Sequence, residues 1–136
     1  MKKMKIGSVT TLILVIISVV IVLALLFILL RGNEDDWIKD SKGVYVKHGN
    51  PASTPGYVLE QQNALSCAND LYSQAKSNVI VFNSQCLGAC DNYSIDIVHV
   101  PRTIEDDKSE NQCSDYPHVT PYFIELDSEG NVVRVA

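Results

Sequence analysis

Charged residues are absent between Ile6 and Leu30, and basic residues are scarce beyond that stretch. From Gly32 to Ala136 there are seven Lys and Arg against sixteen Asp and Glu, a net charge of −9, although the whole chain has a formal net charge of −5. Nucleic-acid binding needs clustered Lys and Arg to neutralise phosphates. The composition therefore excludes nucleic acid as a partner, and we interpret the acidic surface as solubilising.

Sequence motifs of several enzyme classes are also missing. No Ser-His-Asp order, Gly-rich phosphate loop or paired-carboxylate motif is found, and there is no internal repeat. One acidic group has the oxygen-rich character that calcium prefers, without the ligand order or central Gly of an EF-hand. It comprises Glu105, Asp106, Asp107, Glu110 and Asp115. We interpret this group as a solvated loop and expect no resident metal or cofactor.

The uncharged stretch is long enough to cross a membrane. At 1.5 Å per residue, a helix of about 20 residues spans the roughly 30 Å hydrocarbon core and satisfies its own backbone hydrogen bonds. A cleaved signal peptide has a shorter apolar region and a small-residue cleavage site. The segment from Leu25 to Arg31 contains no pair of small residues. We therefore expect a retained signal-anchor that contacts membrane lipid through residues 6–30.

Lysines before the anchor predict its orientation. Lys2, Lys3 and Lys5 precede the apolar stretch, whereas Arg31 alone stands on the other side, before an acidic run. The positive-inside bias places the N-terminus in the cytoplasm and exports the remainder of a single-pass protein. The predicted organisation is a cytoplasmic tip (1–5), a transmembrane helix (6–30), a linker (31–36) and an extracytoplasmic α+β domain (37–136).

Apolar periodicity predicts one main helix in the outer domain, over residues 55–76, with Thr54 as its side-chain cap and Pro55 at its first position. Short strands are expected at 44–46, 79–82, 93–97, 122–126 and 132–135. Strand 93–97 alternates as a half-buried strand does, and Asp127–Asn131 predicts a hairpin turn. Residues 85–92 and 102–121 are expected to be loops. The predicted fold is α+β, with the helix packed on a small, mostly antiparallel sheet. Trp37 is expected either at the lipid headgroups or packed under the domain.

Four cysteines lie on the side predicted to be exported, where disulfides persist. They are Cys67, Cys86, Cys90 and Cys113. An even number favours two disulfides, and the sequence does not choose among the three possible connectivities. A Cys67–Cys113 bond would contribute roughly 3–4 kcal/mol by closing a long loop, whereas a Cys86–Cys90 bond would close almost none and would indicate reactivity.

The segment Cys86-Leu-Gly-Ala-Cys90, together with Thr120-Pro121-Tyr122-Phe123-Ile124 and the 127–133 hairpin, resembles part of the thioredoxin superfamily. The resemblance implies a redox site in which Cys86 and Cys90 lie beside a cis-Pro121. Copper-chaperone relatives with a Cys-x-x-x-Cys motif share this pattern. That family places a helix directly after its cysteines to lower a thiol pKa. Here only Asp91 and Asn92 separate Cys90 from the next expected strand.

Two other chemical roles are weighed for this region. A tetrahedral metal site would need Cys86, Cys90 and Cys113 with a histidine, for which the candidates are His48, His99 and His118. Their spacing matches no zinc pattern and exported thiols oxidise, so we predict no metal site. Asn92-Tyr93-Ser94 is an N-glycosylation sequon, which makes Asn92 a candidate modification site.

A second resemblance covers most of the outer domain. It involves Lys47-His48-Gly49-Asn50-Pro51, Pro101-Arg102, Glu110-Asn111-Gln112-Cys113, Phe123-Ile124-Glu125-Leu126-Asp127 and Gly130-Asn131-Val132. These segments are similar to those of uncharacterised archaeal single-pass membrane proteins with a small extracytoplasmic, cysteine-containing domain. The resemblance implies a location and supplies no activity.

The sequence favours a non-catalytic envelope protein whose disulfide-stabilised outer domain binds an envelope protein or glycan. This hypothesis depends on the anchor, the small core and the missing catalytic motifs. The alternative is a membrane-tethered thiol-disulfide oxidoreductase or metal-handling protein that uses Cys86 and Cys90, with Pro121 beside them.

Overall fold

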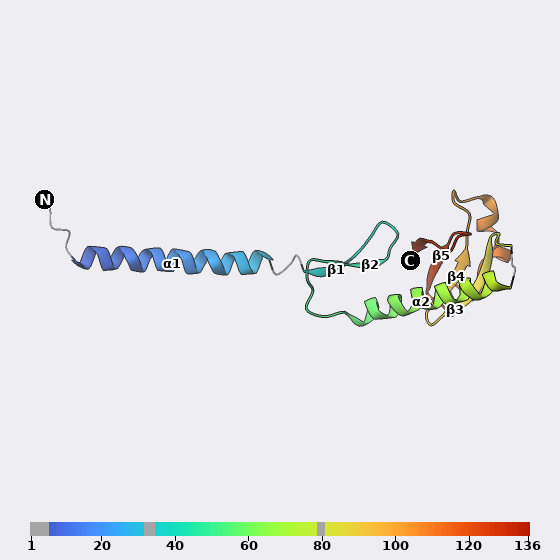
Figure 1. Ribbon diagram of the computed structural model, residues 1–136, viewed down its shortest axis with the longest axis horizontal. Coiled ribbons are helices and arrows are strands. Elements are labelled where there is room, and N and C mark those ends of the chain that lie inside the picture. The colour runs from blue at the N-terminus through green and yellow to red at the C-terminus, as the bar shows by residue number, and fades with distance from the viewer. Residues whose placement is uncertain (1–5, 32–34, 79–80) are drawn as a thin grey trace.

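The computed structural model describes residues 6–31, 35–78 and 81–136 (Figure 1). The predicted cytoplasmic tip and part of the predicted linker therefore lie outside the described residues. Helix α1 (Ile6–Arg31) stands apart from the rest of the chain, and its side chains from Val9 to Leu30 are exposed (Figure 1). The span Val9–Leu30 has a mean hydropathy of 3.7 and none of it is buried, so α1 is a candidate membrane span.

A two-stranded antiparallel sheet follows α1. It consists of β1 (Asp36–Lys39) and β2 (Tyr45–His48), joined by a turn in which Gly43 has a φ of +86°. The turn is held against the rest of the domain, since Val135 N–H donates to Lys42 O at 2.7 Å. Trp37 is half-buried, and its Nε1 donates to Ser53 O at 3.1 Å. The indole therefore packs within the domain.

Helix α2 (Gly56–Ser77) confirms the helix predicted over 55–76. The predicted Thr54 cap is wrong, because Pro55 occupies the N-cap position and no side chain caps the helix. The Pro55 carbonyl accepts hydrogen bonds from Val58 N at 3.0 Å and Leu59 N at 3.2 Å. Thr54 consequently lies one residue before the cap position, where a side chain cannot take that role.

Helix α2 covers one face of a four-stranded sheet with the order β3-β4-β5-β6 (Figure 1). The strands are β3 (Gln85–Cys90), β4 (Tyr93–Ile97), β5 (Tyr122–Leu126) and β6 (Val132–Val135). The β3–β4 and β5–β6 pairs are antiparallel and the β4–β5 pair is parallel. The core lies between helix and sheet and includes Ala64, Ala68, Tyr72, Ile95, Ile97, Ile124 and Leu126. The predicted α+β class is confirmed, with one parallel pair in a mostly antiparallel sheet.

Strand β3 is an element that sequence reasoning placed wrongly. The segment from Cys86 to Cys90, predicted as a loop, forms this strand, with a bulge between Cys86 and Gly88 and a φ of +139° at Gly88. A bulged strand of small residues lacks the alternation that identifies a strand. The strand expected at 79–82 is not formed at residues 81–82, where Val81 is 87% exposed. Residues 79–80 lie outside the described part.

Residues 98–121 connect the two parallel strands, and we call this segment the crossover. It contains two short 3₁₀ helices, η1 (Ile104–Asp107) and η2 (Ser109–Asn111). The crossover covers the sheet face opposite α2, because Ser94 Oγ on β4 is hydrogen-bonded to Thr120 Oγ1 and Ser94 is fully buried. Strand β4 is therefore buried on both faces. The strand was predicted at the right position. The prediction that its second face is exposed to solvent was wrong, because the crossover covers that face.

Candidate functional site

Two disulfides attach the edge strand β3 to both of its neighbouring layers. Cys67 of α2 bonds to Cys90 at the end of β3, and Cys86 at the start of β3 bonds to Cys113 of the crossover. The predicted disulfide bonding is confirmed, with a pairing that the sequence did not select. The bonded residues are 23 and 27 positions apart. Each closed loop of this size stabilises the fold by roughly 3–4 kcal/mol in the chain-entropy model.

The residues of the hypothetical redox site take a different arrangement. Cys86 and Cys90 are not bonded to each other, and the cis peptide bonds of the described residues precede Pro101 and Pro117 rather than Pro121. The geometry implied by the thioredoxin resemblance is therefore not formed. Cys86 and Cys113 also lie within 4.8 Å of a carboxylate oxygen of Asp96, but both sulfurs are in the disulfide bond.

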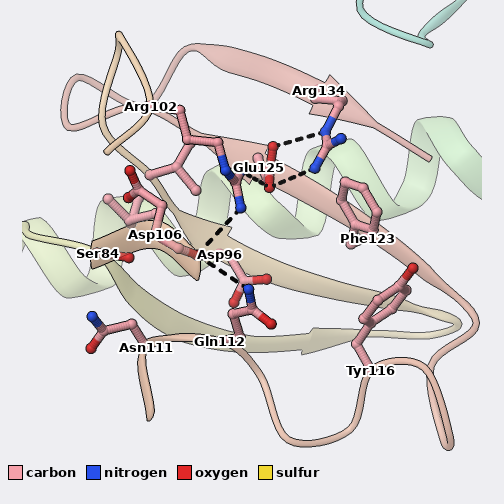
Figure 2. Close-up of a pocket in the computed structure, with 12 residues that line it drawn as sticks. Ser84, Asp96, Arg102, Asp106, Asn111, Gln112, Tyr116, Phe123, Glu125 and Arg134 are labelled. Carbon is pink, nitrogen blue, oxygen red and sulfur yellow. Dashed lines mark hydrogen bonds and ion pairs between the residues drawn. The ribbon is translucent and has the colours of Figure 1, made fainter. Parts of the chain in front are cut away.

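A polar pocket lies between the crossover and the sheet, and we call it the crossover cleft (Figure 2). Its empty space is about 430 Å³ and opens to solvent. The sheet contributes side chains from β4, β5 and β6, the crossover contributes most of the others, and Ser84 lies just before β3. The residues that matter most for its chemistry are Asp96, Arg102, Gln112, Tyr116, Glu125 and Arg134.

Glu125 binds both arginines of the cleft. This side chain on β5 is 6% exposed, and Arg102 and Arg134 reach its two oxygens from different sides (Figure 2). Arg134 donates from Nε to Oε2 at 3.0 Å and from NH2 to Oε1 at 3.1 Å. Arg102 donates to Oε1 and also pairs with Asp107 at 3.0 Å. The hydrogen bond to Glu125 is the largest cause of a raised Arg102 pKa.

Asp96 is the carboxylate of the cleft that no cation neutralises. It lies on β4 directly opposite Glu125 in the parallel pair. Among the described residues, its carboxylate accepts one hydrogen bond, from Cys113 N–H at 3.0 Å, and no Lys, Arg or His nitrogen lies within 4.0 Å. Burial raises the pKa of Asp96 to about 6. The Cys113 hydrogen bond and the charge of Arg102 oppose this change, whereas the charge of Glu125 reinforces it.

An aromatic wall borders the charged groups. Tyr116 of the crossover packs edge-on against Phe123 of β5, with ring centroids 5.3 Å apart, and Tyr116 is 39% exposed. The guanidinium of Arg134 lies 4.6 Å from the centre of the Phe123 ring. Gln112 donates its Nε2 to Asp106 O at 3.2 Å, and among the described residues its Oε1 accepts no hydrogen bond. The lining of the cleft therefore includes a tyrosine ring and an amide oxygen as well as Asp96.

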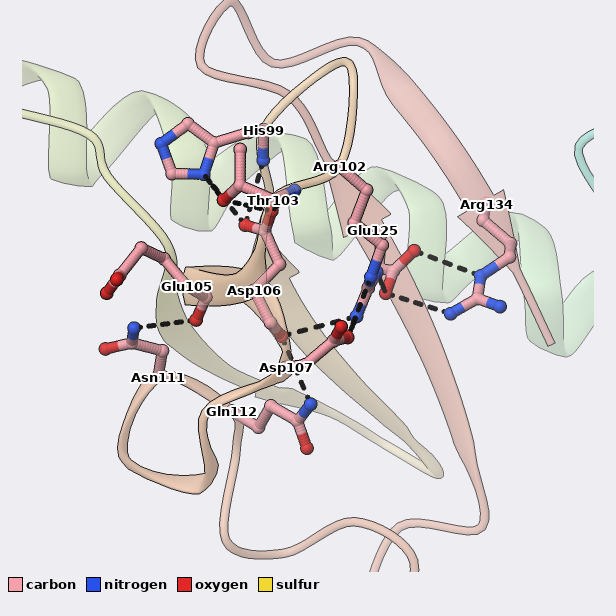
Figure 3. Close-up of polar contacts among 10 residues, drawn as sticks. All are labelled: His99, Arg102, Thr103, Glu105, Asp106, Asp107, Asn111, Gln112, Glu125 and Arg134. Atoms are coloured by element: carbon pink, nitrogen blue, oxygen red, sulfur yellow. Dashed lines mark hydrogen bonds and ion pairs between the residues drawn. The ribbon is translucent and has the colours of Figure 1, made fainter.

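Asp106 fixes the start of the crossover (Figure 3). It is 1% exposed and accepts hydrogen bonds from His99 N and Nδ1, both at 3.0 Å, and from Thr103 N at 2.6 Å and Oγ1 at 3.0 Å. Burial acts to raise the pKa of Asp106, but these hydrogen bonds outweigh it and hold the pKa well below its usual range. The predicted solvated acidic loop is therefore wrong at Asp106.

The Asp106 cluster carried a sequence signal that we did not use. Thr103 and Asp106 have the spacing of a capping box, in which each side chain bonds the backbone of the other residue. His99 lies just after β4, and its Nε2 points away from Asp106 (Figure 3). The other candidate histidines lie apart in sequence and element, His48 at the end of β2 and His118 late in the crossover.

Asn92 of the sequon is exposed in the turn between β3 and β4. Its Nδ2 donates to Glu60 of α2, and its carbonyl accepts from Tyr122 N–H at 3.1 Å. Glycosylation at Asn92 remains a prediction of the sequence.

Comparisons with protein-family models, with curated proteins and with solved structures find no match for this chain. The crossover cleft and helix α1, a candidate membrane span, are the features that bear on function.

Proposed function

We propose that this protein is a membrane-anchored, non-catalytic binding module whose outer domain takes part of an envelope component into the crossover cleft. The observation that carries the proposal is the cleft itself, a polar pocket whose walls are fixed before any ligand arrives. A disulfide from β3 ends on the crossover at Cys113, and Arg102 ties the crossover to Glu125 of the sheet. Fixed walls favour binding because little conformational entropy is lost when a ligand enters.

The location follows from two features that support each other. Helix α1 is a candidate membrane span, and two disulfides are typical of a compartment outside the reducing cytoplasm. The lysines before α1 favour a cytoplasmic N-terminus. We therefore propose a single-pass protein with its C-terminal domain outside the cytoplasm.

Location is tested on intact cells that express the full chain. A membrane-impermeant biotinylating reagent should label exposed lysines of the domain, such as Lys42 and Lys76, without cell lysis. A cytoplasmic protein in the same cells should stay unlabelled and serves as the control for leakage. Labelling that appears only after lysis would place the domain in the cytoplasm and overturn the proposed location.

Binding is tested with the full chain in lipid nanodiscs. A ligand that binds the folded state raises the unfolding temperature as its concentration passes the dissociation constant. We would screen primary amines, carboxylates and neutral oligosaccharides at millimolar concentration. At least one probe should raise the unfolding temperature of the wild type and not that of Tyr116→Ala.

The matched control is Tyr57→Ala, which removes an exposed tyrosine whose ring contacts Tyr45 outside the crossover cleft. This variant should respond to the probe as the wild type does. If no probe raises the unfolding temperature of the wild type and Tyr57→Ala while leaving that of Tyr116→Ala unchanged, the binding proposal is overturned.

A further inference from the structure

We propose that the crossover cleft binds an aliphatic primary ammonium group, as carried by a lysine side chain of a partner protein, and that Asp96 is its counter-ion. This inference rests on the proposed binding function and names the chemistry of the ligand.

The distribution of charge in the cleft leaves one negative group unmatched. The lining carries three carboxylates, Asp96, Asp106 and Glu125, against two guanidinium groups. Asp106 is satisfied by four hydrogen bonds from its own segment, and Glu125 takes both arginines. Asp96 is thus the one carboxylate of the cleft lining without a counter-ion. A cationic ligand would supply that counter-ion.

The arginines are poorly suited to an anionic ligand. Arg102 is engaged by Glu125, by Asp107 and by the carbonyl of Asp106 at 3.3 Å. Arg134 makes two hydrogen bonds to Glu125 and lies over Phe123. An incoming carboxylate or phosphate would have to break buried ion pairs and would meet Asp96 at close range. Both effects cost binding energy.

A divalent cation is also a poor fit. Calcium takes six to eight oxygen ligands and magnesium needs a near-octahedral set. Among the acceptors that line the cleft, the Asp96 carboxylate accepts a single hydrogen bond and the Gln112 amide oxygen accepts none among the described residues, and the Tyr116 ring lines the same cleft. An ammonium group has three N–H donors and is attracted to the face of an aromatic ring. The acceptor set matches an ammonium better than a metal ion.

The aromatic wall favours an alkyl stem over an amino sugar. Sugar rings bind well when a flat aromatic face is free to contact them, but the Phe123 ring is covered by Arg134 and by the packed edge of Tyr116, so Phe123 offers no such face. A flexible four-carbon lysine stem is narrow and buries its methylene groups along such a wall. Among the sources of a primary ammonium, a lysine side chain therefore fits the shape of the cleft best.

The test uses two probes that differ only in charge, with the full chain in nanodiscs at pH 7.5. One is Nα-acetyl-lysine methylamide, and the other is the same molecule acetylated at Nε. We expect the charged probe to bind at least tenfold more tightly, and Asp96→Asn to weaken it by at least tenfold. Asp115→Asn, which changes an exposed crossover aspartate outside the cleft lining, should leave the affinity unchanged.

The pH dependence separates a counter-ion from a structural residue. The other charged groups that line the cleft with Asp96 are Glu125 on β5, Arg134 on β6, and Arg102 and Asp106 on the crossover, and the charges of Glu125 and Arg102 act on Asp96. Affinity for the charged probe should fall as the pH drops through about 6, because burial raises the pKa of Asp96 to about 6 while the lysine ammonium keeps its proton. This dependence should vanish in Asp96→Asn, whose folded state is checked by its unfolding temperature.

The outcomes distinguish this inference from the function on which it depends. Equal binding of the two lysine probes, or tighter binding of glucosamine than of the lysine probe, would overturn the inference. If the probe that binds in either of these cases still failed to bind Tyr116→Ala, the proposed binding function would be retained. Binding of no probe in a Tyr116-dependent way would overturn both.

Discussion

Asp96 and Glu125 lie directly opposite each other on adjacent parallel strands, yet both arginines of the crossover cleft form ion pairs with Glu125, and neither forms one with Asp96. Two like charges at neighbouring positions on a sheet repel each other. The two ion pairs offset the negative charge of Glu125, whereas Asp96 has no ion-pair partner among the described residues. The domain therefore carries an ionised, largely buried carboxylate at neutral pH, an arrangement that lowers stability and is typical of a functional site.

The first prediction concerns the stability cost of Asp96. Because its folded pKa of about 6 lies above the ordinary value of 3.8, the folded state binds an extra proton between these pH values. The free energy of unfolding should rise as the pH falls from 7 towards 4. Asp96→Asn should stabilise the protein by roughly 2–3 kcal/mol at pH 8 and remove this pH dependence. Chemical denaturation across the pH range measures both effects. Stability unchanged or lowered at pH 8 would contradict the burial argument.

The second prediction concerns the two ion pairs of Glu125. Glu125→Gln leaves Arg102 and Arg134 without their shared counter-ion and should destabilise the fold by roughly 1–3 kcal/mol. The matched control is Glu105→Gln, which breaks a more exposed pair with Lys108 and should cost less than about 0.5 kcal/mol. Equal effects of the two substitutions would show that the cleft pairs contribute no more than a surface pair.

The third prediction concerns Asp106 and acid stability. Its folded pKa is lowered, so its contribution is present above the unfolded value of about 4 and is lost as the pH falls further. Asp106→Asn should lower the free energy of unfolding by about 2 kcal/mol at pH 7, since Asn cannot accept all four hydrogen bonds. The variant should also lose less stability than the wild type between pH 4 and pH 2. An acid titration of unfolding by circular dichroism reports the difference.

The fourth prediction concerns the β5–β6 turn. Gly130 has a φ of +86°, and a Cβ added there would lie 2.6 Å from the Tyr72 ring. Gly130→Ala should destabilise the fold by roughly 1–3 kcal/mol through backbone strain and this overlap. Gly56→Ala at the start of α2 meets no atom within 4 Å and should be neutral or stabilising by up to about 1 kcal/mol. Thermal unfolding of the two variants tests the contrast, and equal stability of Gly130→Ala and Gly56→Ala would contradict both the strain and the overlap.

The fifth prediction concerns the disulfides. Each disulfide contains one almost completely buried cysteine, Cys90 or Cys113, whereas Cys67 is half-buried and Cys86 is exposed. Because one sulfur of each bond is buried and both bonds tie packed elements together, mild reductant should leave both bonds intact in the folded protein. Alkylation followed by mass spectrometry should find no modified cysteine until the chain is unfolded. Rapid reduction of the Cys86–Cys113 bond under native conditions, together with turnover of a disulfide substrate, would instead favour the tethered oxidoreductase.

Elements with a strong local pattern could be predicted from the sequence. The apolar stripe of α2 and the turn residues before β6 depend on neighbours within a few positions, and both were found almost to the residue. Strand β3 was missed because its bulge at Gly88 breaks the alternation and because disulfides, rather than apolar side chains, attach it to the layers beside it.

The site could not be predicted because it depends on contacts between distant segments. Asp96 and Glu125 become neighbours only through the parallel register of β4 and β5, and alternation alone placed Asp96 on a solvent-facing side. The crossover that covers that face has no periodic pattern. The one local signal available was the Thr103–Asp106 spacing, which marks where the crossover begins to fold back.

The two disulfides also form a continuous covalent route through the domain, from Cys113 in the crossover to Cys86, along β3 to Cys90, and then to Cys67 in α2. Under the proposed function, a partner bound by the crossover would pull on this segment when the two surfaces move apart. That force can travel from the crossover to α2 without loading the hydrogen bonds between strands. Tension applied to the crossover at Cys113 would therefore be carried to α2 by covalent bonds, without first separating the strands of the sheet.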